Sequence, residues 1–431
     1  MKTVIDFLIF QLLDKPPIFL GIISLIGLLL QGKKFNDVID GVVKTVVGIT
    51  ILSIGSSMLT STLGPVMAQL NTRLGVKGVL PANEAAFGVA MDSLSSKIVI
   101  TFLIGFFLHL LLVKFTPGNR FKNVYLTVHI MLFLATFLTV SLPQVLGTSS
   151  NMTVAISAIL CAFYWTYTPA IPRVLSKKWT GDVLTLGHHQ QIGAWLASKL
   201  GKLVGDPNDD AENIKLPKSI SVFRDNTISL AFLMPLIFIG IGLAIGEQGI
   251  SELAGTSNWL TWLFLQGISF TAGIVILLSG VRMFISSIVP AFKGISDKFL
   301  PGSIPALDCP VFFPYSPMGS MLGFLASVAG ALLVMILTIF LSPIIVFPSP
   351  IIMFFDGSTM GVFGNKYGGW KGALVAGFTT SIIAHLGVVL LYPLTGSLYG
   401  SGLTFSNIDF SLFWLPLMYV LKLIGSLLGL A

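Results

Sequence analysis

Charged residues are scarce in this chain of 431 residues: they make up 10% of the sequence, against roughly 25% in soluble domains. Hydrophobic residues make up 54%, and the mean hydropathy is +0.90. So few charges cannot cover a water-facing surface, which excludes a soluble globular domain. The apolar runs reach about 20 residues and lack the alternation of barrel strands, so we expect an all-α polytopic membrane protein.

Cysteine is almost absent. The two cysteines, Cys161 and Cys309, lie in apolar stretches, which disfavours a disulfide framework. The adjacent histidines His188 and His189 have no cysteine or carboxylate near them at ligand spacing, so we expect no metal site and no other cofactor. HExxH, GxSxG and P-loop patterns are also missing, which disfavours a membrane-embedded enzyme.

The charges that are present lie mainly between apolar runs. A net charge of +7 fits loops that face an anionic membrane surface and lipid headgroups, not a nucleic-acid patch. Most lysines and arginines fall on one face of the predicted topology, which makes that face cytoplasmic and places the first residues outside. We predict about eleven transmembrane helices, at residues 18–31, 43–63, 98–114, 124–142, 152–171, 227–246, 259–280, 318–341, 344–363, 372–394 and 410–430.

The two halves of the sequence repeat each other weakly. The segments 48–65 and 273–290 share Gly, Ile, Leu, Met, Ser and Pro at matching positions, and further matches follow at nearly the same offset. The partners lie five crossings apart, so they run in opposite directions through the membrane. We therefore predict two inverted five-helix repeats, at 1–225 with a cytoplasmic loop and at 226–408, followed by one C-terminal helix at 409–431.

Each repeat carries one acid at a matched point. "LPANEAAF" (80–87) and "IPALDCPVF" (304–312) align at their Pro-Ala pairs, which puts Glu84 opposite Asp308. A simple interpretation is that these acids cap helix starts or pair with Lys77 and Lys298. An ionisable residue at membrane depth is, however, a functional candidate by default.

The stretches that hold these acids are polar and rich in glycine and proline. They follow Pro65 and Pro290 and continue for about 20 residues without clearly crossing the membrane. Irregular backbone survives at that depth only where protein or a water-filled cavity satisfies its polar groups. We therefore predict paired re-entrant segments, which in transporters indicate the substrate site.

Six motifs carry a family resemblance: "GSSMLTST" (55–62), "HIM" (129–131), "GHHQQIGAW" (187–195), "GVRMF" (280–284), "LPGSIPALDC" (300–309) and "FFDGSTMGVFGNKYGGWKGAL" (354–374). Their order, over nearly the whole chain, resembles the ascorbate-type permease component, enzyme IIC, of the bacterial phosphoenolpyruvate-dependent sugar phosphotransferase system. The resemblance implies a homodimer in the bacterial cytoplasmic membrane that moves its substrate inward by an elevator-like motion. Its core and dimerisation domains would be interleaved across both repeats.

The same resemblance implies partners. A separate cytoplasmic enzyme IIB, which receives its phosphoryl group through enzyme IIA, would phosphorylate the substrate as it enters. Phosphoryl transfer would then belong to enzyme IIB, since this chain shows no phosphoryl-carrying domain. Whether the chain counts as an enzyme therefore depends on the complex.

The resemblance implicates eight positions in substrate binding. Four keep the residue types of the family: Ser56, His129, His188 and Asp308. Four depart from them: Asn83, Glu84, Phe133 and His189. An ionised Glu84 beside Asp308 would repel the ascorbate anion, which favours a neutral polyol or sugar, unless the two acids share a proton.

A second class of transporter fits the same pattern. An ion- or proton-coupled secondary transporter would use inverted repeats with Glu84 or Asp308 as its proton or sodium site. Phosphorylation of the product distinguishes the two functions. Asp356 is a lower-ranked candidate for the site, and the acidic segment 206–213 is expected to be a solvated loop.

Overall fold

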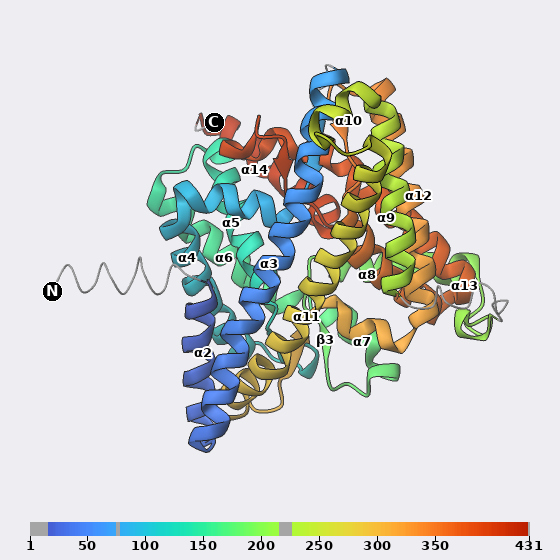
Figure 1. Cartoon of the computed structure of the whole chain (residues 1–431). Helices are drawn as coiled ribbons and strands as arrows, with labels where there is room; N and C mark the ends of the chain where they lie inside the picture. The colour runs from blue at the N-terminus through green and yellow to red at the C-terminus, as the bar shows by residue number, and fades with distance from the viewer. Residues whose placement is uncertain (1–15, 75–77, 215–225, 430–431) are drawn as a thin grey trace. The chain divides into compact units, whose positions relative to one another are not determined.

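A computed structural model of the chain describes residues 16–74, 78–214 and 226–429 (Figure 1). The chain divides into two compact units, and each unit takes one segment from each half of the sequence. The first unit combines Met1–Gly78 with Leu216–Ile295, and the second combines Val79–Lys215 with Ser296–Ala431.

The first unit is built from helices. They are α2 (Pro16–Leu30), α3 (Phe35–Leu74), α9 (Asn226–Ile245), α10 (Glu247–Ala254) and most of α11 (Trp259–Phe299). Arg73 near the end of α3 forms an ion pair with Glu252 on α10. Both α3 and α11 continue past their internal prolines, Pro65 and Pro290. The expectation of irregular backbone directly after these prolines was therefore wrong for the described residues, because each of the two helices continues for two more turns.

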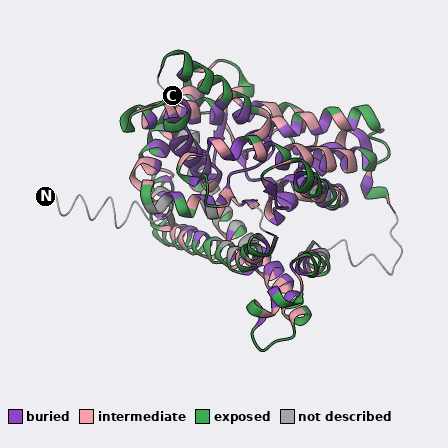
Figure 2. Cartoon of the chain, turned by 90° about the horizontal axis from the view of Figure 1, so that it is seen from above, coloured by how far each residue is buried: buried purple, intermediate pink, exposed green. Residues whose placement is uncertain are grey.

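The second unit holds eight α-helices among its described residues: α4 (Asn83–Phe115), α5 (Val128–Leu146), α6 (Ser150–Tyr167), α7 (Ala170–Thr180), α8 (Gln191–Val204), α12 (Pro317–Leu341), α13 (Pro350–Leu391) and α14 (Leu415–Leu427). Most helices carry both buried and exposed residues (Figure 2). Large apolar side chains such as Phe340 and Leu236 are largely exposed, which suits contact with lipid. Helix α5 differs, because 83% of its apolar window is buried.

Six short strands, which the sequence analysis did not predict, form two three-stranded sheets. Their bounds are β1 (Gly78–Pro81), β2 (Asn123–Tyr125), β3 (Thr185–Leu186), β4 (Ile304–Leu307), β5 (Ile345–Val346) and β6 (Leu403–Thr404). One sheet has the order β5-β1-β6 and the other β2-β4-β3. The pairs β1–β6, β2–β4 and β3–β4 are parallel. Each sheet thus has a central strand from one half of the sequence and flanking strands from the other half.

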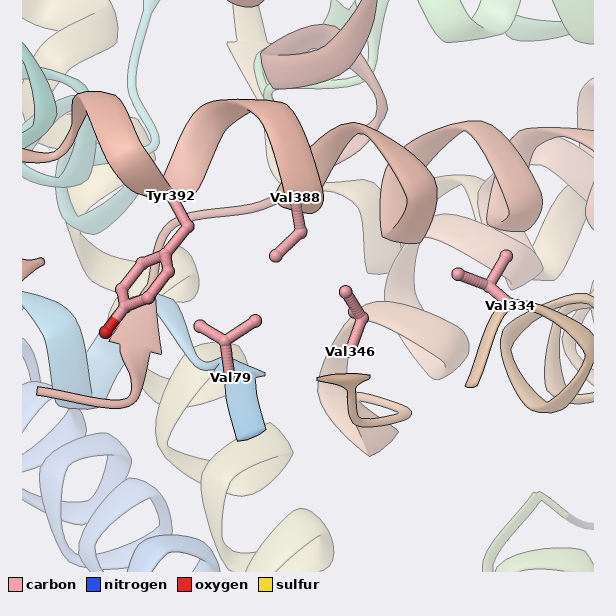
Figure 3. Packing of buried hydrophobic residues seen from close by; sticks show 5 residues of the cluster. All are labelled: Val79, Val334, Val346, Val388 and Tyr392. Carbon is pink, nitrogen blue, oxygen red and sulfur yellow. The ribbon is translucent and has the colours of Figure 1, made fainter. Parts of the chain in front are cut away.

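A cluster of buried side chains holds the β5-β1-β6 sheet against α12 and α13. Val79 of β1 and Val346 of β5 lie between Val334, Val388 and Tyr392 (Figure 3). The hydroxyl oxygen of Tyr392 also accepts hydrogen bonds from two backbone amides, at residues 400 and 402, 2.7 and 2.9 Å away. The apolar cluster therefore holds the sheet, and the Tyr392 hydroxyl holds the loop that leads into β6.

Helix α13 is a folded-back pair of helices. Its regular geometry is interrupted at Gly368 and Gly369, and Gly369 has φ +61°, a conformation that favours glycine. An added Cβ at Gly323 of α12 would meet the backbone of Gly361 at 2.4 Å, and one at Gly377 would meet the carbonyl oxygen of Gly323 at 2.2 Å. The backbones of α12 and both arms of α13 can approach this closely only because glycine lies at each crossing.

Eight helices of the described residues are long and apolar enough to cross a membrane, or nine if a bent pair at 230–254 is one span. This is fewer than the eleven expected. The count leaves out α2, which has 15 described residues, and it takes the two arms of α13 as one span. The polytopic all-helical class is confirmed, while the number of eleven remains a prediction.

Most of the acidic segment 206–213 is exposed, as expected for a solvated loop, and Glu212 and Asp210 also anchor it to α12 and α13. The Glu212 carboxylate accepts hydrogen bonds from the Met318 amide at 2.8 Å and from Ser316 at 3.0 Å, at the start of α12. Asn365 donates to Asp210 at 2.6 Å. A carboxylate at a helix N-terminus is favoured by the orientation of the backbone dipoles, so this loop fastens the first turn of α12.

Candidate functional site

Asp308 marks the end of the central strand β4. The buried strand stops at Leu307, and the Asp308 carboxylate accepts a hydrogen bond from the Cys309 amide at 2.7 Å, which caps the short helix that follows. Asp308 is 5% exposed. Among the described residues no lysine or arginine forms an ion pair with it, so its neighbours are other polar groups.

Two imidazoles lie beside this carboxylate. Nε2 of His129, in the first turn of α5, is 3.5 Å from Oδ2 of Asp308, and Nε2 of His188 is 3.9 Å from Oδ1. The sheet explains why three residues so distant in sequence converge. The strands β2, β4 and β3 are parallel neighbours, and His129, Asp308 and His188 each follow the carboxyl end of one of them. Such strand ends are common ligand sites in parallel sheets.

The polar atoms of this cluster are incompletely used. Both distances exceed the range of about 2.7–3.2 Å for a good hydrogen bond. Among the described residues, Nδ1 of His129, Nδ1 of His188 and Oε2 of Glu84 are buried without a hydrogen-bond partner. Buried polar atoms are normally paired. These three atoms therefore leave donors and acceptors that a small polar ligand can use.

Aromatic rings surround the cluster. Phe133, buried one turn after His129 on α5, lies 5.9 Å from the His129 ring and 5.7 Å from the ring of Phe87. His189 points elsewhere: its ring packs 4.9 Å from Phe410, and neither of its nitrogens has a partner among the described residues. Phe133 therefore supplies an apolar wall next to His129, while His189 lies in an aromatic environment of its own.

Asn83 lies just after the end of β1, the central strand of the other sheet. Strand β1 ends at Pro81, and the Ala82 amide still donates to the Thr404 carbonyl of β6. Asp308 directly follows β4, whereas Asn83 and Glu84 follow β1 by two and three residues. The pairing of Glu84 with Asp308 from the Pro-Ala alignment stays a prediction.

The side chain of Asn83 is already occupied. Its Oδ1 accepts from the Ser406 amide at 2.8 Å, and its Nδ2 donates to the Ser406 carbonyl at 3.0 Å and to Asn407 Oδ1 at 2.8 Å. Glu84 is half-buried and close enough to Asp308 for the two charges to interact. Ser56 lies on α3, but its side chain is outside the described part of the chain.

The structure also reveals buried carboxylates with roles that the sequence analysis missed or ranked low. Asp356 is 3% exposed and Asp409 is 0% exposed. Asp409 accepts a hydrogen bond from the Ile192 amide at 3.1 Å and one from the Gly193 amide at 3.0 Å, both in the first turn of α8. The sequence signal was present, since both acids interrupt strongly apolar stretches, but their partners lie at least 51 residues away and have no local spacing.

The residues at and around Asp308 include three side chains of types that can bind a metal. His188, Asp308 and Cys309 offer ligand atoms within 4.8 Å of one another, although the sequence analysis found no cysteine or carboxylate near the histidine pair. The fold brings them together across more than a hundred residues. A metal-bound imidazole usually donates its other N–H to a fixed partner, and Nδ1 of His188 has none among the described residues. The group therefore lacks, among the described residues, the outer contact that usually supports a metal-bound imidazole.

Apolar exposed helices of membrane-spanning length define a polytopic helical membrane protein. The sequence profile described as PTS system sugar-specific permease component matches residues 11–409. This chain belongs to that family and is a multi-pass protein of the cytoplasmic membrane. The ascorbate-specific PTS system EIIC component of Mycoplasma pneumoniae is 30% identical to it over 88% of this chain. The chain covers 64% of that relative's length, which is just under two thirds.

Proposed function

We propose that this protein is a sugar-specific permease, enzyme IIC, that binds ascorbate or a related sugar or polyol and moves it inward. The observation that carries the proposal is the cluster of Asp308 with His129 and His188, which lies at three adjacent strand ends and keeps unpaired polar atoms. Hydroxyl-rich ligands need such a mixed set of acceptors and donors. Family membership supplies the class of substrate.

Inverted five-helix repeats with paired re-entrant segments and a C-terminal helix remain part of the proposal. Two features support them. The sheets exchange strands between the halves of the sequence, since β1 pairs with β5 and β6 while β4 pairs with β2 and β3. Each compact unit also combines a segment from both halves, as expected for core and dimerisation domains that are interleaved. An elevator-like motion of the core and a homodimer in the lipid bilayer follow from the family resemblance.

Transport is proposed to be coupled to phosphorylation by a separate enzyme IIB, which enzyme IIA supplies. No step of that reaction is assigned to the histidines or to Asp308, which would hold the substrate and orient its hydroxyls. The charge of the preferred substrate depends on the charge of Glu84. The name of the relative from Mycoplasma pneumoniae favours ascorbate, whereas an ionised Glu84 beside Asp308 favours a neutral polyol.

The alternative, a proton- or ion-coupled secondary transporter, draws on one observation. Asp308 and Glu84 are acids without a lysine or arginine partner among the described residues, and such acids can carry a coupling ion. Proteoliposomes separate the two functions. Uptake driven by an ion gradient alone, with unmodified product inside, would support the alternative.

The first test is binding to the purified protein. Calorimetry with ascorbate and with a panel of neutral polyols and pentoses, at two pH values, should show one saturable ligand. Vesicles supplied with enzymes IIA and IIB and phosphoenolpyruvate should then accumulate the phosphorylated form of that ligand. Absence of binding by every sugar and sugar acid tested, in protein that remains folded, would refute the proposed function.

A further inference from the structure

Asp356 lies at the centre of a buried hydrogen-bond network on the first arm of α13. Its Oδ1 accepts from Gln190 Nε2 at 2.8 Å and from Asn407 Nδ2 at 2.7 Å, and its Oδ2 accepts from the Ile408 amide at 2.9 Å. No lysine, arginine or histidine of the described residues forms an ion pair with it. A buried carboxylate with three neutral donors and no cation carries a desolvation cost. Such a residue is a candidate for a functional role.

The donors belong to the two segments that follow β3 and β6. Gln190 comes two residues after His188, at the entrance to α8, and Asn407 lies in the turn after β6. These segments also bond directly, because the Asp409 amide donates to the His189 carbonyl at 3.1 Å. Asp356 thus ties together the two turns that cross at the ends of the sheets.

The network continues to both strand-end junctions. On one side Asn407 accepts from Asn83, which follows β1. On the other side Gln190 fixes the short segment that presents His188 to Asp308. One carboxylate therefore connects the hydrogen-bonded Asn83 to the junction at Asp308, where polar atoms of the imidazoles are unpaired among the described residues.

We propose that Asp356 is a positioning residue that sets the orientation of His188 toward Asp308 through Gln190. It does not contact the substrate itself, because all of its near neighbours are protein donors and its side chain is buried. The role at the substrate site rests on the proposed function. The effect on the position of His188 does not.

The key variants exchange the carboxylate and the amide. Asp356→Asn turns an acceptor pair into one acceptor and one donor, and the new donor faces either Gln190, Asn407 or the Ile408 amide. We expect ascorbate, or the neutral polyol that the wild type binds, to bind about 10- to 100-fold more weakly. The double variant Asp356→Asn with Gln190→Glu restores a carboxylate and an amide at the contact between these two positions. It should recover a large part of the lost affinity but not all of it, because Asn407 Nδ2 donates to the same oxygen of Asp356 and then faces the new amide.

The matched control is Ser381→Ala. Ser381 is also buried on α13 and donates to the Ser327 carbonyl at 2.7 Å, but it lies on the second arm and outside the network. It should lower the thermal stability without a comparable loss of binding. Equal losses of binding for Asp356→Asn and Ser381→Ala, or no rescue by the exchanged pair, would overturn the positioning role.

A readout without substrate separates this inference from the proposed function. The rate at which diethylpyrocarbonate modifies His188, followed by mass spectrometry of the folded protein, should rise several-fold in Asp356→Asn and return in the exchanged pair. If the wild type binds no sugar but this change appears, the proposed function fails and the positioning role holds. An unchanged rate of His188 modification in folded Asp356→Asn refutes the positioning role whatever the protein binds.

Discussion

The central strands of the two three-stranded sheets lead into different chemistry. At the end of β1, Asn83 forms three short hydrogen bonds with Ser406 and Asn407. At the end of β4, Asp308 has two imidazoles at 3.5 and 3.9 Å, and the outer nitrogens of both rings lack partners among the described residues.

The comparison teaches how one kind of junction can serve two purposes. Neutral amides that satisfy one another rigidify a buried crossing without needing anything else. An acid between two imidazoles leaves capacity for a ligand and is stable only because water or a ligand supplies the missing bonds. We infer that the β5-β1-β6 end holds the fold and that the β2-β4-β3 end binds.

The largest effect is expected from breaking the binding end. Asp308→Asn replaces the carboxylate between His129 and His188 by a neutral amide, and His129→Ala removes one of the two imidazoles. Each should weaken substrate binding by about 10- to 100-fold, since a hydrogen bond to a charged group contributes about 1.5–3 kcal/mol. Calorimetry measures the affinity, and size-exclusion chromatography checks that the variants stay folded. Wild-type affinity in either variant would remove that residue from the site.

Asn83→Ala tests the holding end. It removes the Asn83 hydrogen bonds to the Ser406 amide, to the Ser406 carbonyl and to Oδ1 of Asn407, so the protein should lose about 1–3 kcal/mol of stability. Thermal unfolding of the purified protein should show a clear drop, and substrate affinity should fall less than in Asp308→Asn. A stable Asn83→Ala protein with strongly reduced affinity would mean that Asn83 contacts the substrate after all.

Glu84→Gln sharpens the charge at the binding end. The change keeps the size of the side chain and, if Glu84 is ionised, removes a negative charge close to Asp308, so the ascorbate anion should then bind roughly tenfold more tightly. Affinity for a neutral polyol such as xylitol should change much less, and it serves as the control. If both ligands respond alike, Glu84 acts through hydrogen bonding and not through charge.

The smallest effect concerns how the β2-β4-β3 sheet is fastened from outside the membrane spans. Arg173 donates to Asp182 at 2.8 Å and to Asn123 of β2 at 3.1 Å. The hydrogen bond from Arg173, and then its charge, hold the pKa of Asp182 below its usual range. A lowered pKa gives stability that is present above the ordinary pKa of about 4 and is lost as the pH falls further.

Asp182→Asn should therefore lower the thermal stability slightly at pH 7, and the gap from wild type should close as the pH falls below about 4. Unfolding temperatures at a series of pH values measure it. Arg173→Lys is the companion variant, because it keeps the charge and loses the two-pronged contact. A gap that stays constant with pH would mean that the ion pair does not contribute through its charge.

Much of this molecule could be predicted from the sequence. Hydropathy was sufficient for the helical membrane class, and the motifs identified the family. His129, His188 and Asp308 were named together, and the structure places them together. Strands of two to four residues escaped prediction because they are too short to show an alternating pattern.

The hydrogen-bond network escaped for a different reason. Asp356 bonds to Gln190 and Asn407, which are 166 and 51 residues away, so no local spacing could reveal the contacts. The anchoring of the exposed acidic segment 206–213 escaped for the same reason, since its Glu212 binds a helix start more than a hundred residues later. Side chains that satisfy distant backbone groups become visible only when the fold is known.

The two cysteines have a practical consequence. Cys161 and Cys309 are both buried, with 0% exposure, and the chain contains no others. The natural protein therefore offers an exterior without thiols. A single cysteine placed at an exposed position such as Trp195 on α8 or Phe115 at the end of α4 can carry a spin label or a dye. Distances during a transport cycle can then be followed by spectroscopy in a nearly unaltered protein.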